Sequence, residues 1–292
     1  MIRRRNARTV FLFALFCAVT GALIWALPPA AAMAGDDERV RVGYHFAPGS
    51  SEQYKFEFNQ EYEVRGYAFY TLIDLEYTET CIEAENDTLF TMEITVDKVS
   101  AQMKRNDDLM DSGLDEDMKG QTFRFLINKN GMISGIQAKG YIESEDEVMQ
   151  IMQVVFSGGY PYLPDSTMGV GDEWTFEGST IRDQKSDIEV ESDAAFKIEE
   201  FKKEKDRRCA LIKREGDRYI SGRVENQGGV FALDGQGEGK AEYFFDISNG
   251  IIIKLKSEST AEITYVDASG GSAGEREAQT TNMSYNLKKE IK

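Results

Sequence analysis

In the stretch Tyr67-Ala-Phe-Tyr-Thr-Leu-Ile-Asp-Leu-Glu-Tyr77, every second residue from Tyr67 onward is aromatic, leucine or β-branched. Successive side chains of a strand point to opposite faces, so this pattern predicts a strand with one buried face. The same period of two recurs in other segments, with charged residues such as Lys55 and Glu93 between the apolar ones. These segments contain Tyr54, Phe56 and Phe58, and Met92, Ile94 and Val96. Sheets with one buried face and one solvent-exposed face are typically antiparallel.

Turn signals separate these strands at short intervals. Asn130-Gly131 and Asn249-Gly250 each lie between apolar runs, which is the strongest short-range signal for a hairpin. We therefore expect a mainly β fold, a curved antiparallel sheet or half-open barrel of about a dozen strands.

Two segments of the chain resemble each other. Residues 123–136 align with residues 242–255, so that the two Asn-Gly pairs coincide and Phe125 meets Phe244. One interpretation is a duplicated meander that ends in the same hairpin in each half. The alternative is chance, because Asn-Gly hairpins between apolar strands look alike.

One amphipathic helix is predicted between the two halves, over residues 143–157. Acidic residues 143–147 suit a helix N-terminus, and Gly158-Gly159 favours a stop. Its apolar residues have the spacing i, i+3, i+4, i+7 and i+8, and we expect this stripe to pack on the concave face of the sheet. The stripe consists of Val148, Ile151, Met152, Val155 and Phe156. The predicted organisation is a leader (1–34) and a single β domain (35–292), with a first half (39–140), helix and linker (141–169) and second half (170–292).

The N-terminus has the features of a signal peptide. Residues 2–8 carry four arginines, an uncharged apolar run extends from Val10 to Leu27, and Ala32-Met-Ala34 offers small residues for cleavage. We expect cleavage after Ala34 and a periplasmic or secreted protein. The alternative is an uncleaved membrane anchor, because the apolar run is just long enough to span a bilayer.

The charge balance excludes several classes of protein. The formal net charge is −17, and the arginine-rich leader contributes only positive charge, so a nucleic-acid partner is not expected. The single histidine, His45, excludes sites that need several imidazoles. We expect no metal, no cofactor and no catalytic residue. A hydrolase acting through a pair of carboxylates stays open, although nothing singles out a pair among the 51 acidic residues.

Beyond the leader the chain has two cysteines, Cys81 and Cys209. An oxidising compartment would permit a disulfide between them. The alternative is two separate buried thiols, which behave as small hydrophobic residues.

Aromatic and methionine side chains on the predicted strands and helix are candidates for an apolar ligand cleft under the helix. Methionine adapts to ligands of varied shape, although all these residues could simply fill a core. The candidates are Tyr54, Phe56, Phe58, Phe69, Met92, Phe123, Phe125, Met149, Met152, Phe156, Trp174 and Tyr243.

The layout of leader, antiparallel strands and mid-chain helix resembles the LolA/LolB-type half barrel of bacterial lipoprotein carriers. The phrases Pro48-Gly49 before Tyr54, Leu163-Pro-Asp165 and Val170-Gly-Asp-Glu-Trp174 are similar to the PGxxY and LP…VGDxW elements of exported bacterial families of unknown function. The resemblance covers about residues 39–292 and implies a carrier architecture with an apolar ligand region and no catalytic residue.

The sequence therefore favours an exported, soluble, non-catalytic protein that binds a lipophilic ligand, either an acyl chain or a lipoprotein tail. The alternative is a structural or protein-interaction module of the cell envelope, docking through its acidic face and exposed strand edges. In neither case do we expect a membrane span in the mature chain.

Overall fold

The computed structural model describes residues 38–64, 67–106, 108–110, 113–142, 145–183, 188–226, 229–267 and 275–291. The predicted leader, residues 1–34, lies outside the described residues. The elements are β1 (Arg39–Val42), β2 (Ser51–Val64), β3 (Tyr67–Glu85), β4 (Leu89–Arg105), β5 (Asp108–Met110), α2 (Leu114–Met118), β6 (Thr122–Asn128), β7 (Ile133–Ala138), α3 (Glu145–Gly159), β8 (Ser166–Gly169), β9 (Glu173–Asp183), β10 (Ile188–Glu204), β11 (Arg207–Asn226), β12 (Gly229–Asp246), β13 (Ile251–Asp267) and β14 (Glu275–Ile291).

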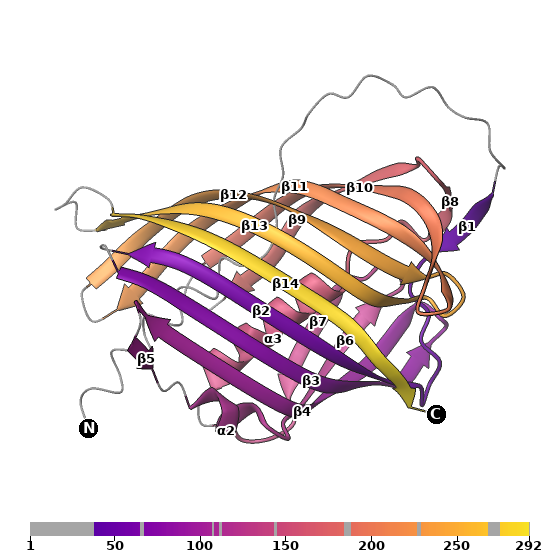
Figure 1. Ribbon diagram of the computed structural model, residues 1–292, viewed down its shortest axis with the longest axis horizontal. Coiled ribbons are helices and arrows are strands. Elements are labelled where there is room, and N and C mark those ends of the chain that lie inside the picture. Colours follow the sequence, from indigo (N-terminus) through magenta and orange to yellow (C-terminus); the bar gives the residue numbers. More distant parts are fainter. Residues whose placement is uncertain are drawn as a thin grey trace.

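One strongly curved sheet of twelve strands contains most of the described chain (Figure 1). Its order is β7-β6-β4-β3-β2-β14-β13-β12-β11-β10-β9, with β5 added beside β4, and neighbouring strands are antiparallel. The first long strand, β2, pairs with the last, β14. The chain thus follows a meander around the sheet, and the free edges are β7 and β9. The predicted mainly β, curved antiparallel fold is confirmed.

Helix α3 lies on the inner side of the curved sheet and contacts both edge strands, β7 and β9 (Figure 1). It occupies the place where the sheet does not close by strand pairing. The helix is Glu145–Gly159 rather than the predicted 143–157, because it continues through the two glycines. Gly158 and Gly159 are both buried, so tertiary packing offsets the roughly 1 kcal/mol that glycine costs in a helix.

A second, two-stranded sheet pairs β1 with β8, an element that the predicted linker 141–169 did not include. The side chain of Asp165 holds this region in place through ion pairs with Arg41, at 3.0 Å, and with Lys129. Nearby, the N–H of Tyr44 donates to the carbonyl of Lys129 at 2.9 Å. Through these non-covalent contacts with Lys129, Asp165 and the segment between β1 and β2 hold the small sheet against the Asn130-Gly131 hairpin.

The two halves repeat one turn geometry at their first long strands. The N–H of Gly49 donates to the carbonyl of Cys81 at 2.8 Å, and that of Gly171 donates to the carbonyl of Ile198 at 2.8 Å. In each case the partner residue donates back to the residue after the glycine, at 3.0 and 3.1 Å. Both glycines have a positive φ, 85° and 89°. A duplicated meander predicts this repeat of backbone geometry.

Candidate functional site

The inner face of the sheet carries the apolar residues of the period-two pattern. Tyr54, Phe56 and Phe58 of β2 are 1%, 2% and 3% exposed, whereas the residues between them are half-buried or exposed. The apolar stripe of α3 packs against this face, and the rings of Phe156 and Phe125 lie 4.6 Å apart. Helix α3 and the part of the sheet that it covers share one hydrophobic core, here called the α3 core.

The structure brings together all but one of the predicted ligand residues. Those that belong to, or pack against, the α3 core are Tyr54, Phe56, Phe58, Met92, Phe123, Phe125, Met149, Met152, Phe156, Trp174 and Tyr243. Trp174 is held by its indole N–H, which donates to the carbonyl of Tyr162 at 2.9 Å, and by stacking on Phe196 at 5.4 Å. Phe69 lies apart from this core and stacks on Tyr62 at 4.9 Å.

The α3 core includes a buried carboxyl group. Glu79 of β3 is 1% exposed, lies opposite Glu52 of β2 and accepts a hydrogen bond from the hydroxyl of Tyr160, the residue after α3. Burial, and to a lesser degree the charge of Glu52, raises the pKa of Glu79 well above its ordinary value. Through its hydrogen bond with Tyr160, Glu79 connects the end of α3 to the sheet.

The inner face continues beyond α3 toward the opposite end of the strands. Here the buried apolar side chains do not belong to the α3 core; they are Tyr62, Phe69, Ile220, Leu233, Ala261 and Ile263. Polar residues are buried among the same strands; they are Gln60, Thr71, Ser192, Arg214, Arg218 and Ser259. This part of the interior is more polar than the part that α3 covers.

Two of these polar residues are arginines that the sequence analysis missed. Along β11 the positions on the inner face are Ile212, Arg214, Gly216, Arg218 and Ile220. Each of them lies opposite residues of the inner face on the neighbouring strands β10 and β12. The signal was present in the alternation itself, because both arginines occupy the phase of the buried isoleucines.

Arg214 is 5% exposed, and its guanidinium lies over the ring of Phe196, 5.7 Å from the ring centroid. In the described part of the chain this guanidinium makes no ion pair and no hydrogen bond. Burial lowers the pKa of Arg214, since removing a cation from water disfavours the charged form.

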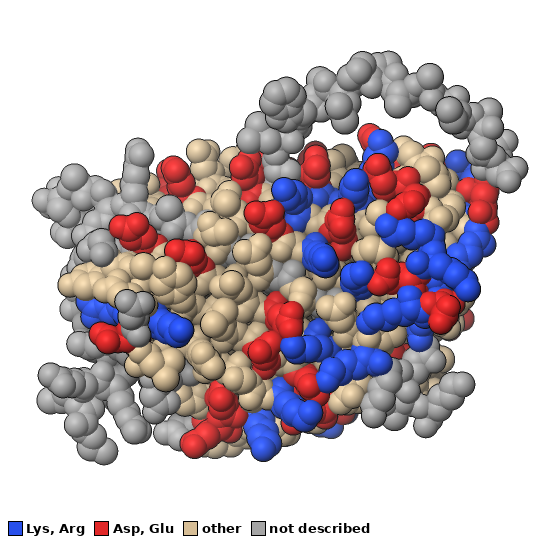
Figure 2. Space-filling model, viewed as in Figure 1, with Lys and Arg blue, Asp and Glu red and all other residues tan. Residues whose placement is uncertain are grey.

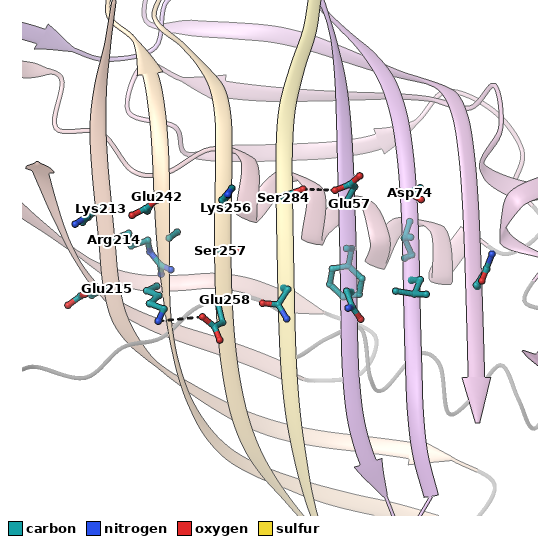
Figure 3. A pocket seen from close by; sticks show the side chains of 18 of the residues that line it. Glu57, Asp74, Lys213, Arg214, Glu215, Glu242, Lys256, Ser257, Glu258 and Ser284 are labelled. Atoms are coloured by element: carbon teal, nitrogen blue, oxygen red, sulfur yellow. Dashed lines mark hydrogen bonds and ion pairs between the residues drawn. The ribbon is translucent and has the colours of Figure 1, made fainter. Parts of the chain in front are cut away.

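A hollow of about 810 Å³ lies across the middle of β11, β12, β13, β14, β2, β3 and β4 (Figure 3). Most of its lining residues point outward, such as Lys213, and the buried residues Arg214 and Ala241 also line it. Its charged side chains form rows of alternating sign across the strands. Lys213 lies opposite Glu242, which lies opposite Lys256. A second hollow, of about 550 Å³, lies farther along β11 to β14. Neither hollow is lined by Glu52 or Glu79, so the buried carboxyl pair does not open into them.

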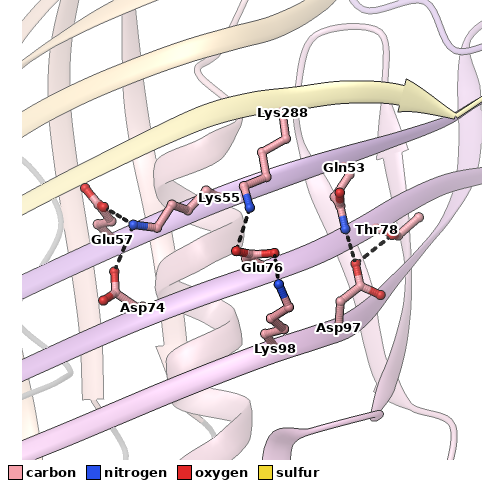
Figure 4. A network of polar contacts seen from close by, with 9 residues as sticks. All are labelled: Gln53, Lys55, Glu57, Asp74, Glu76, Thr78, Asp97, Lys98 and Lys288. Carbon is pink, nitrogen blue, oxygen red and sulfur yellow. Dashed lines mark hydrogen bonds and ion pairs between the residues drawn. The ribbon is translucent and has the colours of Figure 1, made fainter.

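Ion pairs and hydrogen bonds link neighbouring strands on this outer face (Figure 4). Glu76 accepts from Lys98 at 3.1 Å and from Lys288 at 2.5 Å. Asp97 accepts from Gln53 at 3.0 Å and from Thr78 at 2.8 Å. Figure 2 shows both signs of charge intermingled over the strands of this view. Exposed pairs of this kind contribute little stability, typically about 0–1 kcal/mol each.

The candidate disulfide is not formed, and the alternative of two separate buried thiols holds. Cys81 and Cys209 are both free and fully buried. Burial raises the pKa of each thiol to about 11. Each thiol contacts a backbone carbonyl of its own strand, that of Glu83 or Arg207, at 3.6 Å. The two cysteines belong to different strands, β3 and β11, which the order of the sheet separates.

Within the described residues, no cluster of three or more histidine, cysteine, aspartate or glutamate side chains has the arrangement of a metal site. None of the helices in the described part of the chain is long and apolar enough to cross a bilayer.

Comparison with known proteins adds a likeness of fold. No family model matches the sequence, and no curated protein matches it either. Among solved structures, lipovitellin, in a structure described for its lipid–protein interactions, is similar with a TM-score of 0.53 at 11% identity. The match covers 84% of this chain but only 26% of lipovitellin, so the chain spans about a quarter of the length of that protein.

Two further structures match with low TM-scores. A DUF1329 family protein from Desulfovibrio piger has a TM-score of 0.20 at 6% identity, with 82% of this chain and 86% of that chain covered. The β domain of the Bordetella autotransporter BrkA has a TM-score of 0.24 at 11% identity, with 81% of this chain and 99% of that chain covered. At these scores neither likeness contributes to the functional argument.

Proposed function

We propose that the chain is an exported, non-catalytic protein that binds a lipophilic ligand, an acyl chain or a lipoprotein tail, against the inner face of its sheet. The observation that carries this proposal is the extent of that face. It continues beyond α3 with buried apolar side chains, such as Phe69 and Ile263, that are not part of the α3 core. The residues predicted for the ligand cleft lie mainly under α3 and pack against it, so we place the ligand on the part of the inner face beyond the helix.

Helix α3 is suited to act as a cover for this interior. It fills the gap between edge strands β7 and β9, and it is held there by side-chain packing rather than by strand pairing. Displacing it would leave the backbone hydrogen bonds of the large sheet intact. Its movement therefore offers a route by which an apolar chain reaches the inner face.

The energetics of an acyl chain agree with such a site. Burial of each CH₂ group contributes about 0.8 kcal/mol, so a chain of about ten methylenes contributes roughly 8 kcal/mol before the entropic costs of binding. The fold likeness to part of lipovitellin supports an architecture that accommodates lipid. Export rests on the leader features of residues 2–34, and it would place the protein in the periplasm or outside the cell.

The test is the lipid content of the protein expressed from its full-length gene in a bacterial host. Native mass spectrometry should show bound lipid, and the intact mass should show removal of residues 1–34. After delipidation, the neutral probe N-phenyl-1-naphthylamine should bind with an increase in fluorescence. A preparation that carries no lipid and does not bind the probe would contradict the proposal.

A pair of variants on β3 localises the ligand. Phe69→Glu places a charge on the inner face and should weaken probe binding by at least about tenfold, because burying an unpaired carboxylate is costly. Leu72→Glu is the matched control, since Leu72 is 39% exposed on the outer face of the same strand. Its binding should stay within about twofold of the wild type, and equal effects of the two variants would place the ligand elsewhere.

A protein-interaction module is the second candidate, with the outer hollow of about 810 Å³ as its docking surface. The rows of that hollow alternate in sign, with Lys240 and Glu258 paired at 3.4 Å. Such a surface lacks the single-sign potential that steers a charged partner. We therefore rank this function below ligand binding.

A further inference from the structure

The inner wall formed by β10 to β13 is built from small side chains at the level of the two buried arginines. Gly216 of β11 lies opposite Ala194 of β10 and Gly239 of β12. A Cβ atom on Gly216 would lie 2.1 Å from the carbonyl oxygen of Asp193, so no larger residue fits there. The neighbouring strands continue this wall with Ala241, Ser259 and Ala261.

Arg214 and Arg218 are the long side chains of β11 on this wall. Arg214 lies opposite Phe196 and Ala241, and Arg218 lies opposite Ser192 and Gly237. Both arginines are buried, 5% and 1% exposed. This wall of the interior thus combines little side-chain bulk with buried guanidinium groups.

The arrangement of this wall does not explain why the charged side chain of Arg214 is buried. Its guanidinium faces the Phe196 ring and interacts electrostatically with the Tyr243 hydroxyl, and no carboxylate in the described part of the chain pairs with it. Buried guanidinium groups are normally paired, because an uncompensated charge in an apolar interior is strongly unfavourable. A buried guanidinium that has no carboxylate partner and lies on a wall of small side chains is a recognition element for an anion.

We propose that Arg214 binds the anionic head group of an amphiphile whose acyl chain extends along the small-residue wall toward Ile220 and Ile263. This inference rests on the proposed lipid-binding function and adds the chemical class of the ligand, an acyl chain that ends in a carboxylate or a phosphate. Arg218 lies two repeats of the alternation farther along β11, on the same inner face. The planar guanidinium of Arg214 suits bidentate contact with either kind of anion.

The experiment compares three ligands of one chain length that differ in the head group. Delipidated protein from the full-length gene is loaded with N-phenyl-1-naphthylamine, and the probe is displaced by oleate, by oleoyl lysophosphatidic acid or by methyl oleate. The wild type should bind at least one of the two anionic ligands about tenfold or more tightly than the neutral ester. The stronger of the two anions identifies the head group as a carboxylate or a phosphate. Equal displacement by the ester and both anions would overturn the inference while leaving the proposed function standing, and no displacement by any of the three would contradict both.

Variants assign the effect to Arg214. Arg214→Met keeps an unbranched apolar stem and removes the charge, so it should lower affinity for the anionic ligand by about tenfold or more and leave methyl oleate within about twofold. Arg214→Lys should retain part of the preference for the anion. Arg208→Met is the matched control, because Arg208 is on the same strand with its side chain 49% exposed. Unchanged binding of the anion by Arg214→Met would refute the assignment.

A measurement on the wild type alone keeps the test decisive if Arg214→Met does not fold. In oleate labelled with carbon-13 at the carboxyl, the chemical shift of the bound carboxyl should stay at the ionised value to a pH well below the one at which free oleate titrates, since the guanidinium favours the charged form. A bound carboxyl that titrates like the free acid, together with weak binding of lysophosphatidic acid, would overturn the proposal.

Discussion

Replacing Glu79 by glutamine should remove a component of the pH dependence of stability. Glu79 is 1% exposed, lies opposite Glu52 and accepts a hydrogen bond from the Tyr160 hydroxyl. Burial raises its pKa well above the ordinary value of 4.5, so the folded protein holds a proton that the unfolded chain releases above about pH 4.5. The Tyr44 hydroxyl and the Cys81 thiol, whose pKa values are also raised chiefly by burial, interact electrostatically with Glu79.

The size of the effect follows from proton linkage. Below pH 4.5 both states carry the proton, and the contribution of Glu79 to stability is fully present. As the pH rises, the unfolded state loses its proton first, and the free energy of unfolding falls by about 1.4 kcal/mol per pH unit until the folded carboxyl ionises. Glutamine is neutral at every pH and its carbonyl oxygen can accept the Tyr160 hydrogen bond, so the variant should lack this slope.

Urea unfolding of the wild type and Glu79→Gln, at half-unit steps from pH 5 to pH 7 and constant ionic strength, measures the difference between the two slopes. Glu83→Gln, an exposed acid of the same strand, is the control and should keep the wild-type slope. Parallel pH dependences for the wild type and Glu79→Gln would refute the reasoning, since they would mean that Glu79 is ionised in the folded protein.

Other substitutions test the packing of α3, the turns and the thiols. Phe156→Ala should lower the free energy of unfolding by about 3–5 kcal/mol in urea titrations, whereas Tyr141→Ala, at a side chain 88% exposed, should change it by less than about 0.5 kcal/mol. In thermal melts, Gly131→Ala should lower the melting temperature of the protein more than Gly49→Ala does, although both glycines have a positive φ. The reason is that a Cβ atom at Gly131 would lie 2.6 Å from the carbonyl oxygen of Pro161, whereas one at Gly49 would meet nothing within 4 Å. Finally, dithiothreitol should leave the melting temperature unchanged, because the two buried cysteines are unpaired, and a reductant-dependent shift would show that they are bridged.

The period of two identified the inner face of individual strands. In β2 and β3 the aromatic and aliphatic residues at alternate positions are buried, and the i, i+3, i+4 spacing located the buried stripe of α3. These predictions succeed because each depends on the local geometry of one element. The small sheet of β1 and β8 was missed since its strands have four residues each and are far apart in the chain, which leaves too short a pattern to detect.

For the candidate site, the sequence located the apolar residues but missed the charged ones. Phe56 and Met152 share one core because their phases on strand and helix point inward. The two inward arginines of β11, Arg214 and Arg218, were not singled out, because charged residues were assigned to the wet face. Their position in the alternation was the available signal.

The sequence by itself determined the class of the elements, the side of each strand that is buried and the apolar stripe of α3, because the alternation of side chains and the helical period are properties of a single segment. Only the tertiary structure decided that β2 pairs with β14, that α3 fills the gap between β7 and β9, and that Arg214 lies in the interior without a carboxylate among the described residues. Backbone hydrogen bonds between distant strands are the same for every residue type, so the choice of partner strand depends on how the whole sheet curves and packs around its helix.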